Sequence, residues 1–145
     1  MLLSRRKSQD RGKLLLDTSF LLPILGFETS EEIMKSFEKL RFYELYYNDL
    51  SILEALWKIV KVIKGEKEEL LRIREGITAI RDSMRYAPID DKAVENAIRM
   101  YGLGHRDMID NILYSIALSR RFKLLTVDKD LIRFIEKHNL TRSIV

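Results

Sequence analysis

Short apolar runs, separated by longer segments with helical spacing, most constrain what this chain can fold into. The runs are KLLL at 13–16, FYELYY at 42–47, MRYAPI at 84–89 and KLLTV at 123–127, with TRSIV at 141–145 as a candidate fifth. Their length and their content of leucine, valine and aromatic residues are typical of strands. Parallel strands need long crossovers, usually helices, so the pattern predicts an α/β fold of three layers, α/β/α, around a central parallel sheet of four to five short strands.

Apolar residues recur at helical spacing in the segments between these runs. Leu70, Ile73, Ile77 and Ile80, for example, form one stripe along residues 66–83. The same reasoning predicts helices over residues 19–25, 30–40, 49–64, 66–83, 91–104, 106–121 and 128–139.

The composition suits one globular domain, which we expect to span residues 13–145. Hydrophobic residues make up 46% of the 145 residues, and the absence of cysteine excludes disulfides and thiolate metal sites. The longest apolar stretch, residues 14–27, contains Asp17 and is too short to span a bilayer. We therefore expect a cytoplasmic protein with no membrane segment.

The net positive charge lies in the leader, residues 1–12, and in Lys13, which directly follows it. The first 13 residues carry five bases and one acid, and so account for the whole net charge of +4. A basic arm can contact phosphate groups, but such segments are also often solvated and partly disordered, and both interpretations stay open. The leader lacks the apolar core of a secretory signal.

Several carboxylates stand where the expected strands end. Asp17 directly follows the first strand, Asp128 directly follows the last, and Glu54 lies early in the helix after the second. Asp107 and Asp110, three positions apart, begin the helix that leads into the last strand. Because ligands of parallel α/β sheets bind outside the carboxyl ends of the strands, we expect these acids to converge at one edge of the sheet.

Each of these acids alone has a structural explanation, as a helix cap or as a charge at the positive end of a helix dipole. Together, however, crowded carboxylates repel one another, and a hard divalent cation such as Mg²⁺ or Mn²⁺ removes the repulsion. A cation held in this way can activate water and stabilise an attacked phosphodiester. Zinc is not expected, since His105 and His138 are isolated, and we expect His105 to be a cap or a surface residue.

Three segments resemble the PIN-domain nucleases and, within them, the VapC-type toxin ribonucleases: LLLDTSFLL, LSILEALWKI and RDMIDNILYSIALSRRFKLLTVDKDL. The resemblance covers residues 13–131 in order, spacing and local context. It implies a PIN-like fold and four catalytic, metal-binding acids: Asp17, Glu54, Asp110 and Asp128. We expect Asp17 and Asp110 to bind the ion directly, and Glu54 and Asp128 to hold water or a second ion.

The resemblance also implies supporting residues near these acids: Ser19, Asp107, Thr126 and Asp130. Thr126 would orient Asp128 by a hydrogen bond. The resemblance further implies Mg²⁺ or Mn²⁺ as the cofactor, RNA as the substrate, a homodimer, and an antitoxin protein as a partner.

Other interpretations stay open. The chain could be a catalytically silent PIN-like module that binds RNA or a protein partner, although such a domain is expected to have lost at least one of the four acids. A haloacid-dehalogenase-like phosphatase needs an acid where this chain has Ser19, and a receiver domain needs its acidic pair earlier than Asp90–Asp91. Lys58 and Lys61, beyond Glu54 in the same helix, either contact phosphate or are solvated.

Overall fold

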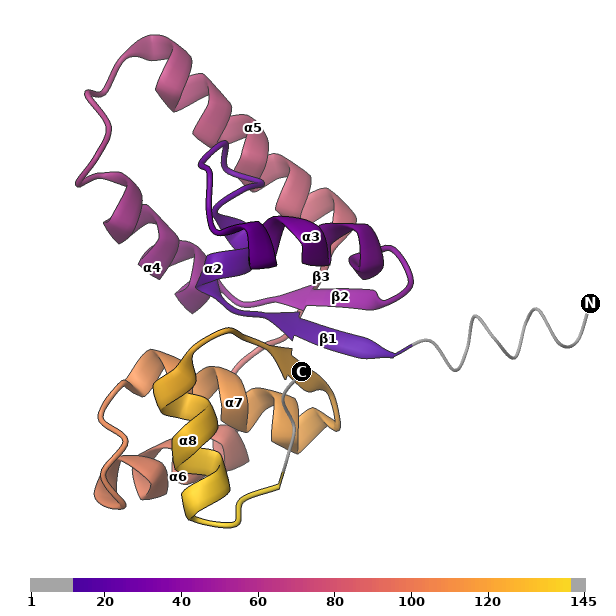
Figure 1. Ribbon diagram of the computed structural model, residues 1–145, viewed down its shortest axis with the longest axis vertical. Helices are drawn as coiled ribbons and strands as arrows, with labels where there is room; N and C mark the ends of the chain where they lie inside the picture. Colours follow the sequence, from indigo (N-terminus) through magenta and orange to yellow (C-terminus); the bar gives the residue numbers. More distant parts are fainter. Residues whose placement is uncertain (1–11, 142–145) are drawn as a thin grey trace, which may run out of the picture.

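Four short parallel strands form the centre of the fold (Figure 1) in this computed structural model, which describes residues 12–141. The strands pair in the order β3-β2-β1-β4, and every pair is parallel. The expected parallel sheet is confirmed with four strands, although the leader up to residue 11 and residues 142–145 of the candidate fifth strand lie outside the described residues. The strand bounds are β1 Lys13–Leu16, β2 Glu44–Tyr47, β3 Arg85–Tyr86 and β4 Lys123–Leu125.

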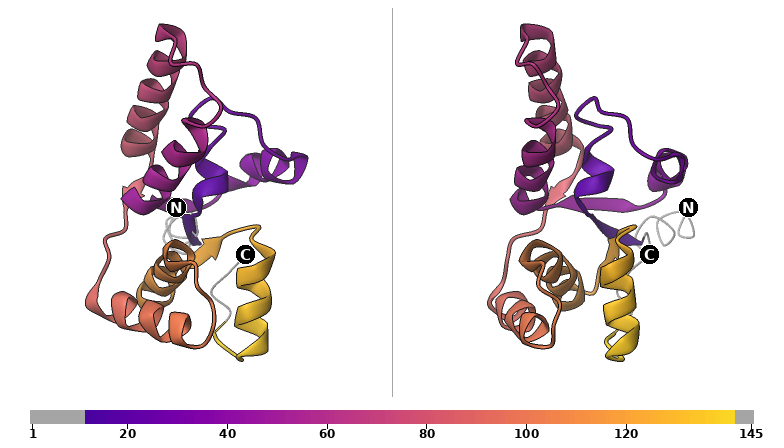
Figure 2. Two further views of the ribbon diagram at one scale, coloured as in Figure 1. Left: turned by 90° about the vertical axis from the view of Figure 1, so that its left-hand side faces the viewer. Right: turned by 60° about the vertical axis from the view of Figure 1, so that its left-hand side comes forward.

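Helices cover both faces of this sheet. Figure 1 shows α2 to α5 above the sheet and α6 to α8 below it, and the turned views in Figure 2 show the same division. The expected three-layer α/β/α arrangement is therefore confirmed. No helix in the described part of the chain is long and apolar enough to cross a membrane. The helix bounds are α2 Thr18–Leu21, α3 Glu31–Leu40, α4 Asp49–Ile59, α5 Lys67–Ser83, α6 Asp91–Gly102, α7 Met108–Arg120 and α8 Lys129–Lys137.

The two faces of the sheet pack against separate hydrophobic cores, because side chains alternate between faces along a strand. Leu15 and Leu124 belong to the core between the sheet and α6 to α8. Leu14, Leu16 and Leu125 belong to the core between the sheet and α2 to α5. All five side chains are buried. A parallel sheet covered on both faces explains why its strands read as nearly continuous apolar runs.

Several expected helices end earlier than their apolar spacing indicated, and α2 and α4 differ most. α2 ends at Leu21, because Pro23 lacks an N–H group and its ring would clash with the preceding turn. α4 ends at Ile59, not near residue 64, and the exposed Val60 gains no burial that would favour another turn. The second, third and fourth strands are also shorter than predicted, although each lies inside its predicted run.

Candidate active site

Five carboxylates surround one depression at the carboxyl ends of the strands. Asp17 follows β1, Glu54 lies in α4 after β2, Asp107 and Asp110 begin α7, and Asp128 follows β4. In Figure 1, α2, α4 and the loop between β4 and α8 accordingly lie at the same, left-hand end of the sheet. The depression has a volume of about 330 Å³, and its remaining lining residues are Thr18, Ser19, Trp57, Lys58, Lys61 and Val127.

Asp17 is held at the end of β1 by hydrogen bonds. Its N–H donates to the carbonyl of Leu125 (3.1 Å), which continues the β1–β4 pairing by one residue. Its carboxylate caps α2 by accepting a hydrogen bond from the N–H of Ser19 (3.0 Å), and it also accepts one from the hydroxyl of Thr126. Burial raises the pKa of Asp17 to about 6, although these two hydrogen bonds and the positive charge of Lys58 act in the opposite direction.

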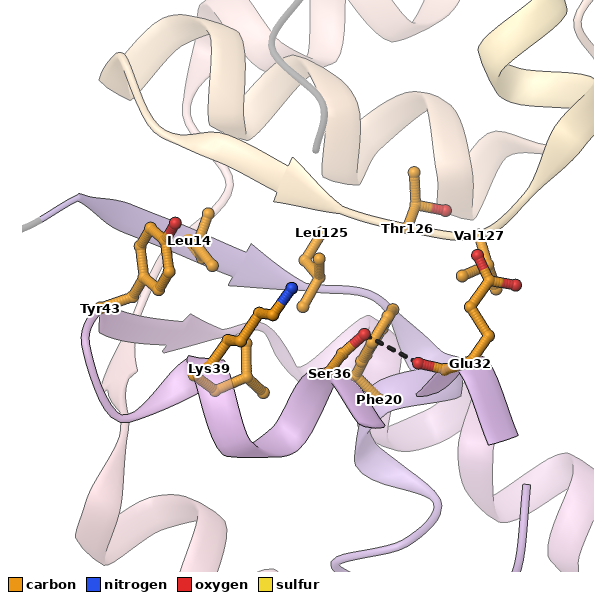
Figure 3. A pocket seen from close by; sticks show the side chains of 10 residues that line it. Leu14, Phe20, Glu32, Ser36, Lys39, Tyr43, Leu125, Thr126 and Val127 are labelled. Atoms are coloured by element: carbon orange, nitrogen blue, oxygen red, sulfur yellow. Dashed lines mark hydrogen bonds between the residues drawn. The ribbon is translucent and has the colours of Figure 1, made fainter. Parts of the chain in front are cut away.

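Thr126 connects two of the acids. While its hydroxyl bonds to the Asp17 carboxylate, the backbone N–H of Asp128 donates to the same hydroxyl oxygen (3.0 Å). The hydrogen bond expected between Thr126 and Asp128 is thus made to the main chain of Asp128. Figure 3 shows that Leu125 and Val127 point into a second depression, of about 250 Å³, beside α3, whereas Thr126 points away from it. Strand alternation therefore directs Thr126 to the opposite side.

Asp110 and Asp128 form a hydrogen-bonded carboxyl pair. Burial, the charge of Asp107, the hydrogen bond to Asp128 and the charges of Asp128 and Glu54 together raise the pKa of Asp110 to about 9. Burial also acts to raise the pKa of Asp128, but hydrogen bonds from the Leu131 N–H (3.0 Å) and from Asp110 outweigh it, so its pKa is lowered. At neutral pH, Asp110 therefore keeps its proton and donates a hydrogen bond to an ionised Asp128.

The other supporting residues expected from the sequence occupy different surroundings. Asp107 is the N-cap of α7 and accepts a hydrogen bond from the N–H of Asp110 (3.1 Å), while Ser19 lines the depression beside Asp17. Asp130 does not line the depression. Its side chain is 86% exposed and its closest basic group is that of Arg133, 3.9 Å away on the same helix. The structure therefore brings Ser19 and Asp107 to the acids but leaves Asp130 outside.

The expectation that His105 is a cap or surface residue is wrong. His105 is buried, and its Nδ1 lies 2.6 Å from Oδ1 of Asn111. The side-chain amide of Asn111 donates to the carbonyl of His105 (2.7 Å), so this pair closes the loop that carries Asp107. Sequence reasoning missed this contribution, although a polar Asn111 next to Asp110 in a largely apolar helix was a usable signal.

The donor set of the depression fits a hard divalent cation. Its acidic side chains offer only oxygen ligands, and neither histidine nor cysteine lines it. As the side chains stand, no group of three acidic or histidine residues between residues 12 and 141 could hold an ion. For an ion to be held there, these side chains would have to turn toward a shared ligand.

Solved structures with the same fold are similar to this chain over most of its length. FitAcB from Neisseria gonorrhoeae has a TM-score of 0.63 at 14% identity, covering 85% of this chain and 93% of that one. A toxin–antitoxin complex from Klebsiella pneumoniae has a TM-score of 0.61 at 13% identity, covering 91% and 95%. VapC20 from Mycobacterium tuberculosis, a sarcin–ricin loop cleaving toxin, has a TM-score of 0.56 at 15% identity, covering 83% and 93%. At these identities the likeness shows a shared fold.

Sequence comparison identifies the family. Curated protein sequences give no significant match to this chain. The model of the PIN domain family, in contrast, matches residues 14–137, a range that includes all five acids of the depression and every strand except the first residue of β1. The chain therefore belongs to the PIN domain family.

Proposed function

We propose that this protein is a ribonuclease that uses Mg²⁺ or Mn²⁺ to hydrolyse RNA phosphodiester bonds, as the toxin of a toxin–antitoxin pair. The observation that carries the proposal is the depression that Asp17, Glu54, Asp110 and Asp128 share at the carboxyl ends of the strands. Membership of the PIN domain family and the toxin–antitoxin complexes among the structural neighbours support it.

In this proposal, Asp17 and Asp110 hold the ion directly. Asp17 is suited to this role because the Thr126 hydroxyl and the Ser19 N–H fix its carboxylate. Asp110 is suited because, besides being buried, it lies among the negative charges of Asp107, Asp128 and Glu54, which a bound cation would offset. A Mg²⁺ or Mn²⁺ ion, when bound, supplies positive charge that offsets the charge growing on the phosphate oxygens, and makes water easier to deprotonate.

The remaining acids position water and move its proton. Glu54 is only half-buried, so its carboxylate is accessible to a water in the depression and can accept a proton from it. Asp128 is kept ionised by its hydrogen bonds and accepts a hydrogen bond from a second water or holds a second ion. Asp107 caps α7 and thereby keeps Asp110 in place.

The biological part of the proposal concerns partners. An antitoxin protein would bind this chain and suppress cleavage, and the active form would be a homodimer acting on cytoplasmic RNA. Solved neighbours that are toxin–antitoxin complexes support the choice of an antitoxin as the partner. Co-purification with the product of an adjacent small reading frame, with loss of RNA cleavage in the complex, tests this part.

Cleavage of RNA by the full-length protein tests the chemistry. We expect cleavage with Mg²⁺ or Mn²⁺, none in EDTA, and a rate lowered by about 10²–10³-fold in Asp17→Asn. Asp130→Asn removes an equivalent charge outside the depression and serves as the matched control, with an unchanged rate. Circular dichroism establishes that both variants are folded.

Two outcomes contradict the proposal. A folded Asp17→Asn protein that cleaves RNA at the wild-type rate would remove Asp17 from the catalytic site. A wild-type protein that cleaves none of a varied set of RNAs with either metal would instead favour a silent module that binds RNA or a protein partner.

A further inference from the structure

Trp57 is an exposed aromatic residue at the rim of the acidic depression. It is the single tryptophan of the chain, its exposed fraction is 54%, and it lines the depression together with Glu54. The two residues are three positions apart in α4, so their side chains leave the helix on the same side. Phe20, in the helix that follows Asp17, is by contrast buried. An indole left in water beside catalytic carboxylates offers a flat apolar surface to a ligand.

Two lysines lie near Trp57, one in α4 and one just after the end of this helix. Lys58 directly follows Trp57, and Lys61 lies in the turn after the helix, and both line the depression. Within the described residues, neither ammonium has a carboxylate within 4.0 Å. Lys58 and Asp17 line the same depression, so the side chain of Lys58 is accessible to a ligand that enters it. The lysines are thus free to bind an anionic ligand.

We propose that Trp57 stacks on an unpaired base of the RNA substrate, while Lys58 and Lys61 contact the phosphates on either side of that base. The combination of an aromatic platform with adjacent cations is how proteins bind single strands without reading their sequence. Because both faces of a base are covered in a duplex, this arrangement makes the site selective for single-stranded RNA. The inference rests on the proposed function only in taking RNA as the ligand.

A protein helix is the alternative occupant of this surface. Leu53 in α4 and Val60, the C-cap of this helix, are also exposed, at spacings of four and three residues from Trp57, and a protein partner would cover all three. Neither Leu53 nor Val60 lines the depression, whereas both lysines do. The two lysines beside Trp57 suit a phosphate backbone, and they therefore favour nucleic acid as the occupant.

Tryptophan fluorescence tests the stacking directly, because Trp57 is the only indole in the protein. Full-length protein carrying Asp110→Asn is titrated with a ten-nucleotide single-stranded RNA of mixed sequence, and separately with the same RNA annealed to its complement. The substitution is used to prevent cleavage, so binding is measured whether or not the wild-type protein is a nuclease. We expect quenching by the single strand and none by the duplex at equal concentration.

Variants on the same Asp110→Asn background measure the contribution of each residue, using anisotropy of labelled single-stranded RNA. Trp57→Ala should weaken binding by about 5–150-fold, and Trp57→Phe should recover most of the loss, since stacking contributes about 1–3 kcal/mol per base. Lys61→Ala should weaken binding and lower the slope of log Kd against log salt by about 0.7. Leu53→Ala, on the neighbouring strip of α4, is the matched control and should bind RNA normally.

The inference is overturned if Trp57→Ala binds single-stranded RNA as tightly as its parent, or if duplex and single strand quench equally. Equal losses in Leu53→Ala and Trp57→Ala would also overturn it, because they indicate a protein-type apolar contact across α4. Cleavage of RNA by the wild-type protein is measured separately and tests the proposed function. Its absence would not change the result of this binding experiment.

Discussion

Replacing Asp110 with asparagine should make the metal-free protein more stable. In the unfolded chain this carboxyl has its ordinary pKa of 3.8 and is ionised at pH 7, whereas in the folded protein its pKa is raised to about 9 and it keeps its proton. Folding at pH 7 therefore includes the cost of protonating Asp110, which is about 4 kcal/mol because pH 7 lies about three units above the unfolded pKa. Asparagine has no proton to take up, and its amide can donate to Asp128 as the protonated acid does.

The measured gain should be smaller than this full cost. The depression opens to solvent, so water can enter and partly solvate the carboxylates, and we expect Asp110→Asn to stabilise the metal-free protein by about 1–3 kcal/mol at pH 7. For a chain of this length, that corresponds to a rise of the melting temperature by about 3–9 °C. The same substitution should abolish the stabilisation that Mg²⁺ gives the wild-type protein, which is about 2.7 kcal/mol at a free ion concentration of 100 times Kd.

Thermal unfolding by circular dichroism, in EDTA and then in Mg²⁺, measures both effects. Asp130→Asn is the matched control, because its exposed carboxylate lies outside the depression, and its melting temperature should stay within about 2 °C of wild type. An Asp110→Asn protein that melts at or below the wild-type temperature in EDTA would refute the reasoning, since Asp110 would then have no proton uptake to lose.

Three further predictions follow from the same structure. Raising the pH from about 5 to about 9 should lower the melting temperature of the metal-free protein, because the stability that a protonated Asp110 provides is fully present below its unfolded pKa of 3.8 and is lost as pH rises toward 9. Asp110→Asn should reduce this dependence of the melting temperature on pH. Thr126→Val should slow RNA cleavage by about tenfold in a kinetic assay and cost about 1–3 kcal/mol in urea unfolding, because it leaves the Asp128 N–H unpaired and removes a hydrogen bond to Asp17. Gly76→Ala should lower the free energy of unfolding by about 1–3 kcal/mol, despite the better helix propensity of alanine, because a Cβ there would lie 2.6 Å from the carbonyl oxygen of Ile24. Urea unfolding measures this loss, and an unchanged midpoint would contradict the contact.

The positions of Asp17 and Asp128 could be predicted because they depend on local pattern. Each acid follows an apolar strand directly and caps the helix that comes next, so the end of the strand alone places it at the carboxyl edge of the sheet. Asp130 follows Asp128 by two residues, and in a helix this spacing turns the side chain by roughly 200°. Proximity in sequence therefore did not bring Asp130 into the site.

The surroundings of His105 could not be predicted because they depend on contacts between distant segments. Its ring lies 5.2 Å from that of Phe134 in α8, measured between centroids, and its Nδ1 contacts Asn111 in α7. Neither contact follows from spacing within one helix. The place of Lys58 in the lining of the depression likewise depends on how α4 packs beside α2, which the apolar pattern of a single helix does not specify.

Binding of Mn²⁺ by the full-length protein, followed by electron paramagnetic resonance while RNA cleavage is measured in the same samples, tests the central claim most directly. We predict that bound Mn²⁺ and cleavage rise together in the wild-type protein, that both are lost in Asp17→Asn and Asp110→Asn, and that both persist in Asp130→Asn. Cleavage that reaches its full rate without bound Mn²⁺, or Mn²⁺ binding that survives both substitutions in the depression, would contradict the claim that these carboxylates form the metal site of a ribonuclease.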